Sequence, residues 1–198
     1  MRPPFSDHLD AETLLLRTIS DRTKAVRAMI ALSKINGYLL SARFQIGRIW
    51  GFLSMAESHS PDWSMWQTQS FQEIHFYSIC WAKIWKMMQV VRDCSGFQSV
   101  KLVCRRHRII LERYTDLRDQ FEHYDERMPA GKKNQSLSHP GDLGNLSGKG
   151  FTLGGKHWDV SPASLAELEK IVADLNAEIH LEGLTRYQDQ QLKNKELS

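Results

Sequence analysis

The sequence predicts an all-α protein, an antiparallel helical bundle in which a glycine-rich loop and a small β-hairpin precede the last helix. Pro61 is the only proline between Asp10 and Met128, and apolar residues recur through that stretch at spacings of three and four, which is typical of amphipathic helices. Seven of the twelve glycines fall in residues 129–155, so the helical pattern stops there. These observations favour helices packed on one another over a large sheet.

The 198 residues are expected to form a single helical domain. Its parts, in chain order, are a bundle core at 9–128, a glycine-rich loop and hairpin at 129–160, a C-terminal helix at 161–184 and a tail at 185–198.

The first long helical stretch extends from Val26 to Leu53. Its apolar pattern passes through Asn36-Gly37, a pair that suits a turn but also occurs as a weak point inside a helix, so one long helix and two shorter ones both remain open. The segment around Pro61 then ends the stretch. Small residues fall near one face of it and are interpreted as places where a neighbouring helix approaches closely: Ser33, Gly37, Gly47 and Gly51.

The next stretch, from Trp66 to Val91, is so apolar that its helix is expected to be central to the bundle. Its apolar stripe, at steps of three and four, consists of Ile74, Tyr77, Trp81, Ile84, Met88 and Val91. Gly96 separates it from a helix whose heptad seam consists of Val103, His107, Ile110, Tyr114, Leu117, Phe121, Tyr124 and Met128. Such a seam packs lengthwise against a helix of the same chain or across a dimer.

The C-terminal part predicts a hairpin followed by one more helix. Residues 151–160 contain two short strand-like runs around Gly154-Gly155, a two-residue turn. Ser161-Pro162 is a helix start, with serine as the cap and proline at the first helical position. This helix is expected to end near Glu182, because Gly183 and a Gln- and Lys-rich tail follow.

The charge balance does not indicate a strong nucleic-acid binder. The 26 Lys and Arg residues exceed the 23 Asp and Glu residues by three, so any basic patch must be local. One such patch lies within residues 101–113, and its candidate RNA-binding residues are Arg105, Arg106, Arg108 and Arg113. Salt bridges between antiparallel helices are the alternative role for these side chains, and no DNA specificity is inferred.

A cytoplasmic protein is expected. The first ten residues do not resemble a signal peptide, and no stretch is apolar enough to cross a membrane. The three cysteines, Cys80, Cys94 and Cys104, form no CxxC pair, which favours reduced thiols.

No cofactor and no metal site are expected. Gly148-Lys149 is followed by Gly150 rather than Ser or Thr, so the phosphate-binding Walker pattern is not met. Cys104 and His107 form a single, isolated CxxH pair. His59, His75 and Cys80 have no other potential ligands at metal-binding spacing. His107 is instead expected to be a hydrogen-bonded core histidine.

The segment Arg118-Asp119-Gln120-Phe121-Glu122-His123 places an arginine and a histidine on the seam helix with four residues between them. This pattern resembles the motif of the HEPN superfamily. Those proteins are small and all-helical, and many are metal-independent ribonucleases of toxin–antitoxin, phage-defence and CRISPR systems. The resemblance implies an endoribonuclease with Arg118 and His123 as the catalytic pair, and as partners an RNA substrate and an antitoxin.

These residue types suit RNA cleavage without a metal. An imidazole can move the proton of the 2′-hydroxyl, and a guanidinium can offset the charge of the phosphorane. Asp119 lies one turn before His123 and is expected to orient its ring. Alternatively, Arg118 and Glu122 form an ordinary i,i+4 ion pair, and the protein is a catalytically silent HEPN-like module that dimerises or binds a partner.

Helix geometry leads to the expectation of a homodimer. Arg118 and His123 are separated by roughly 140° around one helix and about 7.5 Å along it, so one chain hardly aims both side chains at one phosphate. A second copy related by a two-fold axis can complete the site.

Overall fold

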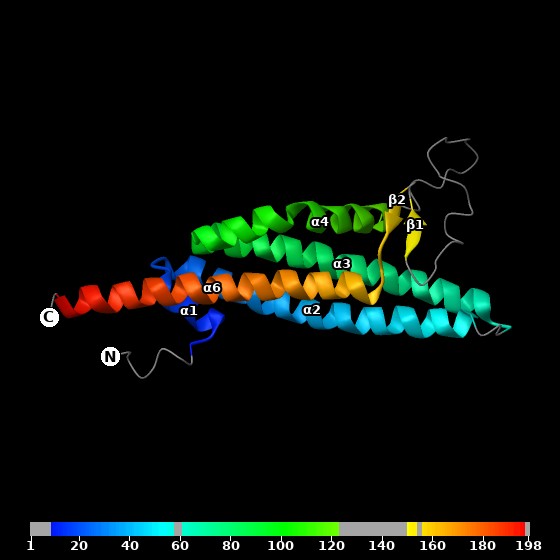
Figure 1. The fold of residues 1–198 in the computed structure, drawn as a ribbon, viewed down its shortest axis with the longest axis horizontal. Coiled ribbons are helices and arrows are strands. Elements are labelled where there is room, and N and C mark those ends of the chain that lie inside the picture. The colour runs from blue at the N-terminus through cyan, green and yellow to red at the C-terminus, as the bar shows by residue number, and fades with distance from the viewer. Residues whose placement is uncertain (1–8, 58–60, 123–149, 154–155, 197–198) are drawn as a thin grey trace. The chain divides into compact units, whose positions relative to one another are not determined.

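The computed structural model describes residues 9–57, 61–122, 150–153 and 156–196, and it is all-α apart from one two-stranded sheet in that part of the chain (Figure 1). The elements in order are α1 (Ala11–Thr18), α2 (Arg22–Glu57), α3 (Trp63–Ser95), α4 (Gln98–Glu122), β1 (Phe151–Leu153), β2 (Lys156–Trp158) and α6 (Pro162–Glu196). Within the described ranges, no helix is both long and apolar enough to span a membrane.

Helix α2 answers the question left open at Asn36-Gly37, because it is one continuous helix of 36 residues. A helical glycine costs about 1 kcal/mol relative to alanine, which the burial of many neighbouring side chains can offset. The prediction that a neighbouring helix approaches closely at the small residues of this stretch is wrong. A Cβ placed at Gly37, Gly47 or Gly51 would have no neighbour within 4 Å in the described structure.

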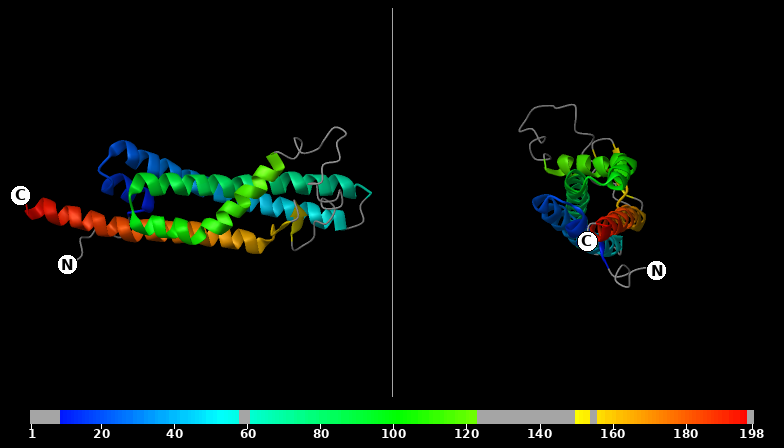
Figure 2. Two further views of the ribbon diagram at one scale, coloured as in Figure 1. Left: turned by 90° about the horizontal axis from the view of Figure 1, so that it is seen from above. Right: turned by 90° about the vertical axis from the view of Figure 1, so that its left-hand side faces the viewer.

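Helices α3 and α4 form a helical hairpin at Gly96, as predicted (Figures 1 and 2). Gly96 has a φ of 66°, the left-handed conformation with which glycine commonly ends a helix. The predicted stripe of α3 is confirmed, because all six of its side chains are fully buried. Of the α4 seam, Val103, Tyr114 and Leu117 are buried within this chain, while Tyr124 and Met128 lie outside the described residues.

The contacts of the chain divide it into two compact units, and each long helix contributes to both. Unit 1 comprises residues 1–37, 83–109 and 169–198, and unit 2 comprises residues 38–82 and 110–168. Buried side chains of unit 1 include Leu14, Leu15, Leu32, Ile35, Met88, Val91, Phe97, Val100, Val103, Ile171, Leu175 and Ile179. Those of unit 2 include Ile46, Ile49, Ile74, Tyr77, Trp81, Leu111, Tyr114, Leu117, Trp158 and Leu168.

In unit 1, the last helix is longer than predicted. Helix α6 continues to Glu196 instead of ending near Glu182, so the segment 185–198 is helical as far as 196 rather than a tail. Gly183 does not stop the helix; it allows a close approach to α1, since a Cβ there would lie 2.9 Å from the Leu14 Cβ. Further along, Arg17 of α1 donates a hydrogen bond to the Tyr187 hydroxyl, 3.2 Å away.

In unit 2, the hairpin is confirmed and is held by aromatic side chains. Strands β1 and β2 are antiparallel with Leu153 opposite Lys156, and the turn residues 154–155 lie outside the described part. The fully buried Trp158 donates from Nε1 to the Leu153 carbonyl at 3.1 Å. On α4, the hydroxyl of Tyr114 donates to the carbonyl of Asp159, and its ring stacks on Trp81 at 3.9 Å.

Candidate functional site

Arg118 lies in the last turn and a half of α4, where two carboxylates hold its guanidinium. Its Nε donates to Asp119 Oδ1 at 2.9 Å and lies 3.4 Å from Glu122 Oε2, and its Nη2 also donates to Asp119. The side chain of Arg118 is 27% exposed, so the guanidinium is partly accessible. The i,i+4 pair between Arg118 and Glu122 that was considered as the alternative is therefore present.

His123 is the second residue of the predicted pair. It lies outside the described residues, and so does its expected contact with Asp119. Among the described residues, Asp119 bonds the guanidinium of Arg118 and so fixes the arginine. Within the described cluster, one cation and two carboxylates leave a local excess of one negative charge.

A histidine that sequence reasoning did not select lies beside this cluster. His75 of α3 stacks on Phe121 of α4, with ring centres 5.2 Å apart and planes 20° from parallel. Its Nε2 is buried and has no hydrogen-bond partner among the described atoms. Burial lowers the pKa of His75 below its usual value; the charge of Glu122 opposes this shift and the charge of Arg118 adds to it.

The place of His75 beside this cluster results from the packing of α3 on α4. This histidine belongs to no local motif, and its spacing to other histidines and cysteines carries no metal-ligand pattern. Counting outward from the hairpin turn at Gly96 places the middle of α3 opposite the end of α4, which is the one signal in the sequence that could have found it.

The four candidate RNA-binding arginines fall into different units. Arg105, Arg106 and Arg108 are exposed residues of unit 1, and Arg106 lies 3.7 Å from Asp174 of α6. Arg113 belongs to unit 2, where it donates to the carbonyl of His157 and lies 5.6 Å from the centre of the Trp158 ring. Arg113 thus fastens the hairpin to α4, while the other three are presented on the surface of unit 1.

His107 and the cysteines have structural surroundings. His107 Nε2 lies 3.2 Å from Asp174 Oδ2 with the ring mostly buried, which agrees with the predicted hydrogen-bonded histidine. The three cysteines are free and buried, and burial raises the pKa of Cys80 and of Cys104 to about 11. These two thiols therefore stay protonated at neutral pH and are poor nucleophiles. In the described ranges, no three His, Cys, Asp or Glu side chains are grouped as metal ligands would be.

Comparison with protein-family models, with curated proteins and with solved structures finds no match for this chain.

Proposed function

We propose that the chain is a metal-independent endoribonuclease of the HEPN type that cleaves RNA with Arg118 and His123. The observation that carries the proposal is the arginine fixed near the end of α4. Two carboxylates orient its guanidinium while leaving the side chain partly exposed, and His123 is the residue that directly follows the last residue of α4. A pre-oriented guanidinium loses little freedom when it meets a phosphate, which is what stabilisation of a transition state requires.

In the proposed reaction the 2′-oxygen of one nucleotide attacks the adjacent phosphorus. The bond from the 2′-oxygen to phosphorus forms, and the bond from phosphorus to the 5′-oxygen of the next nucleotide breaks. His123 accepts the 2′-hydroxyl proton, a water molecule donates a proton to the departing 5′-oxygen, and Arg118 offsets the charge of the phosphorane. The protonated His123 then returns its proton to the hydroxide that the water leaves behind. Asp119 acts as a positioning residue because it holds the guanidinium. The products end in a 2′,3′-cyclic phosphate and a 5′-hydroxyl.

The proposed assembly is a homodimer in which Arg118 of one copy meets His123 of the other. The α4 seam is a poor candidate for this dimer interface, because Val103, Tyr114 and Leu117 are buried within their own chain. The proposed two-fold contact therefore involves the end of α4, where Arg118 is partly exposed.

A catalytically silent, partner-binding helical module is the second candidate. The observation that favours it is the pairing of Arg118 with Asp119 and Glu122, which leaves the end of α4 with excess negative charge. Such a surface repels phosphate unless binding displaces one of the carboxylates.

Cleavage of total RNA in EDTA separates the two candidates. The nuclease proposal predicts cleavage by the wild-type chain that is lost in Arg118→Ala and in His123→Ala. Arg43→Ala and His157→Ala are matched controls, since both residues are exposed, belong to unit 2 and have no part in the proposed site. Cleavage that persists in His123→Ala at the wild-type rate, or no cleavage by any chain, contradicts the proposal.

A further inference from the structure

The two units carry opposite net charges, although the whole chain has a formal charge of only +3. In the described part of unit 1, sixteen Lys and Arg side chains exceed ten Asp and Glu side chains, a net charge of +6. In the described ranges of unit 2, the sequence has five Lys and Arg residues and nine Asp and Glu residues, a net charge of −4. The linear sequence conceals this separation, because each unit is assembled from distant segments.

The positive charge of unit 1 comes from two helix segments. Residues 22–37 of α2 and 98–109 of α4 contain eight Lys and Arg residues and no Asp or Glu. All eight side chains are exposed; they are Arg22, Lys24, Arg27 and Lys34 on α2, and Lys101, Arg105, Arg106 and Arg108 on α4.

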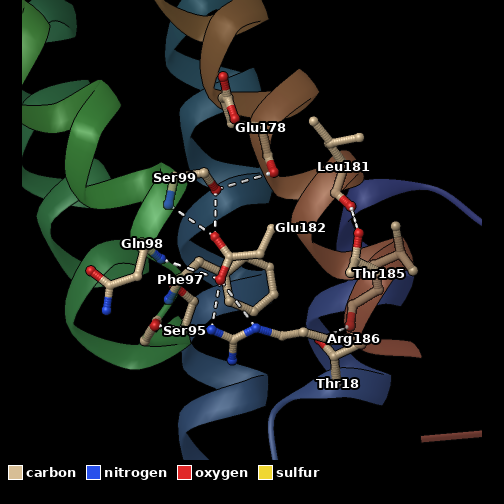
Figure 3. Close-up of polar contacts among 12 residues, drawn as sticks. Thr18, Ser95, Phe97, Gln98, Ser99, Glu178, Leu181, Glu182, Thr185 and Arg186 are labelled. Atoms are coloured by element: carbon tan, nitrogen blue, oxygen red, sulfur yellow. Dashed lines mark hydrogen bonds and ion pairs between the residues drawn. The ribbon is translucent and has the colours of Figure 1, made fainter. Parts of the chain in front are cut away.

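Most acidic side chains of unit 1 lie on α6, and two of them, Glu182 and Asp174, already form hydrogen bonds or ion pairs. The carboxylate of Glu182 accepts hydrogen bonds from Ser99 and Arg186 (Figure 3), and Asp174 pairs with His107 and Arg106. Asp174 therefore offsets part of the charge of one α4 cation, Arg106.

The α4 cations form a row rather than a cluster. Lys101, Arg105 and Arg108 follow at i, i+4 and i+7, a spacing that keeps side chains on one helix face with neighbours about 5–6 Å apart. On α2, Arg27 and Lys34 are two turns apart on one face in the same way. Rows of exposed cations match the regular charges of a nucleic-acid backbone.

We propose that the exposed cations of α2 and of α4 in unit 1, together called its basic surface, bind the phosphate backbone of RNA. This inference rests on the proposed nuclease function. It assigns RNA binding to residues of unit 1 and leaves Arg113 out of the RNA-binding set. It adds the α2 cations, which no motif singled out, to the α4 cations. The competing occupant is an acidic protein, because Leu102 and Ile109, 55% and 84% exposed, lie beside the α4 row and suit a protein contact.

The test measures binding of a fluorescent oligouridylate by anisotropy, in chains that also carry His123→Ala so that the probe stays intact. One variant combines Lys101→Glu with Arg105→Glu on α4, and a second combines Arg27→Glu with Lys34→Glu on α2. The control combines Lys170→Glu with Lys193→Glu on α6, which changes the net charge of the same unit equally. Glutamate is as good a helix former as lysine, and circular dichroism with a melting curve checks that each variant folds.

We expect each of the α4 and α2 variants to bind at least about tenfold more weakly than the control. We also expect the slope of log affinity against log salt to become shallower by about 0.7 for each phosphate that the variant no longer neutralises. Equal weakening in all three variants would mean that only net charge matters and would overturn the proposal. Binding of polyglutamate but not of RNA would assign the surface to an acidic protein, and binding of neither would also overturn it.

The result is separable from the nuclease test. RNA binding that follows the α2 and α4 cations in a chain that leaves RNA uncut would support this surface and contradict the nuclease. Cleavage of RNA with unchanged binding in both variants would support the nuclease and contradict RNA binding by this surface.

Discussion

The carboxylate of Glu182 accepts two hydrogen bonds from Ser99, one from the backbone N–H at 2.9 Å and one from the hydroxyl at 2.7 Å (Figure 3). A third comes from the N–H of Gln98 at 3.2 Å, so a residue of α6 supplies the cap for the N-terminus of α4. Arg186 holds the same carboxylate from one turn further along α6. The negative charge also lies where the dipole of α4 favours it.

Replacing Glu182 tests this cap. Glu182→Gln is expected to lower the free energy of unfolding by about 1–2 kcal/mol, because the charge at the helix terminus and the hydrogen bonds that it strengthens are lost. Urea denaturation measures the difference. Glu178→Gln is the matched control, since Glu178 contributes its backbone carbonyl to Ser99 and not its carboxylate. Equal stability of wild type and Glu182→Gln would contradict the assigned role.

The same carboxylate predicts a pH dependence. Burial alone would raise the pKa of Glu182, but the hydrogen bonds from Ser99, Arg186 and Gln98 outweigh burial and hold the pKa below its usual value of 4.5. The contribution of the cap is therefore complete above pH 4.5 and is lost as the pH falls through the lowered pKa. The difference in stability between wild type and Glu182→Gln should vanish over that range.

A second stability prediction concerns Gly183. Gly183→Ala is expected to destabilise the chain by roughly 1–2 kcal/mol, although alanine is the better helix former, because the new Cβ would lie 2.9 Å from the Leu14 Cβ. Gly47→Ala is the control; it meets no atom within 4 Å and should stabilise by up to about 1 kcal/mol. Stabilisation by both substitutions would show that α1 does not pack on α6 as described.

A third prediction follows from His75. Because its pKa is lowered in the folded chain, stability should be complete above the usual histidine value of 6.5 and decline as the pH falls below it. His75→Phe keeps a ring for the stack on Phe121 and should remove this part of the pH dependence. NMR titration of the imidazole should give a pKa below 6.5, and a value above it would contradict the burial described.

The helical periodicity of the sequence predicted the fold well where one helix buries one stripe. The six stripe residues of α3 were identified because burial imposes the 3.6-residue repeat on a single segment. The end of α6 was not predicted correctly, because a glycine such as Gly183 is typical of a helix stop. The close contact with Leu14 explains why a glycine lies within this helix. Likewise, the pair of Arg118 with Glu122 is local and was anticipated, whereas His75 lies by Phe121 only through packing of α3 on α4.

The fourth prediction concerns the proposed two-fold site. Arg118→Ala and His123→Ala chains, each inactive alone, are mixed and allowed to exchange subunits. A site shared between copies regains one intact pair in each mixed dimer, so a clear fraction of wild-type cleavage should return. A mixture that stays as inactive as its parents, with exchange verified by size-exclusion chromatography of tagged chains, would contradict the shared arrangement.

The chemical form of the cleaved RNA ends shows whether Arg118 and His123 promote attack by the 2′-hydroxyl without a metal. Wild-type chain is incubated with RNA in EDTA, and the new 3′ ends are analysed beside those from Arg118→Ala and His123→Ala. We expect 2′,3′-cyclic phosphate ends from the wild type alone. Ends that arise only when magnesium is restored, or that still form in His123→Ala, would contradict it.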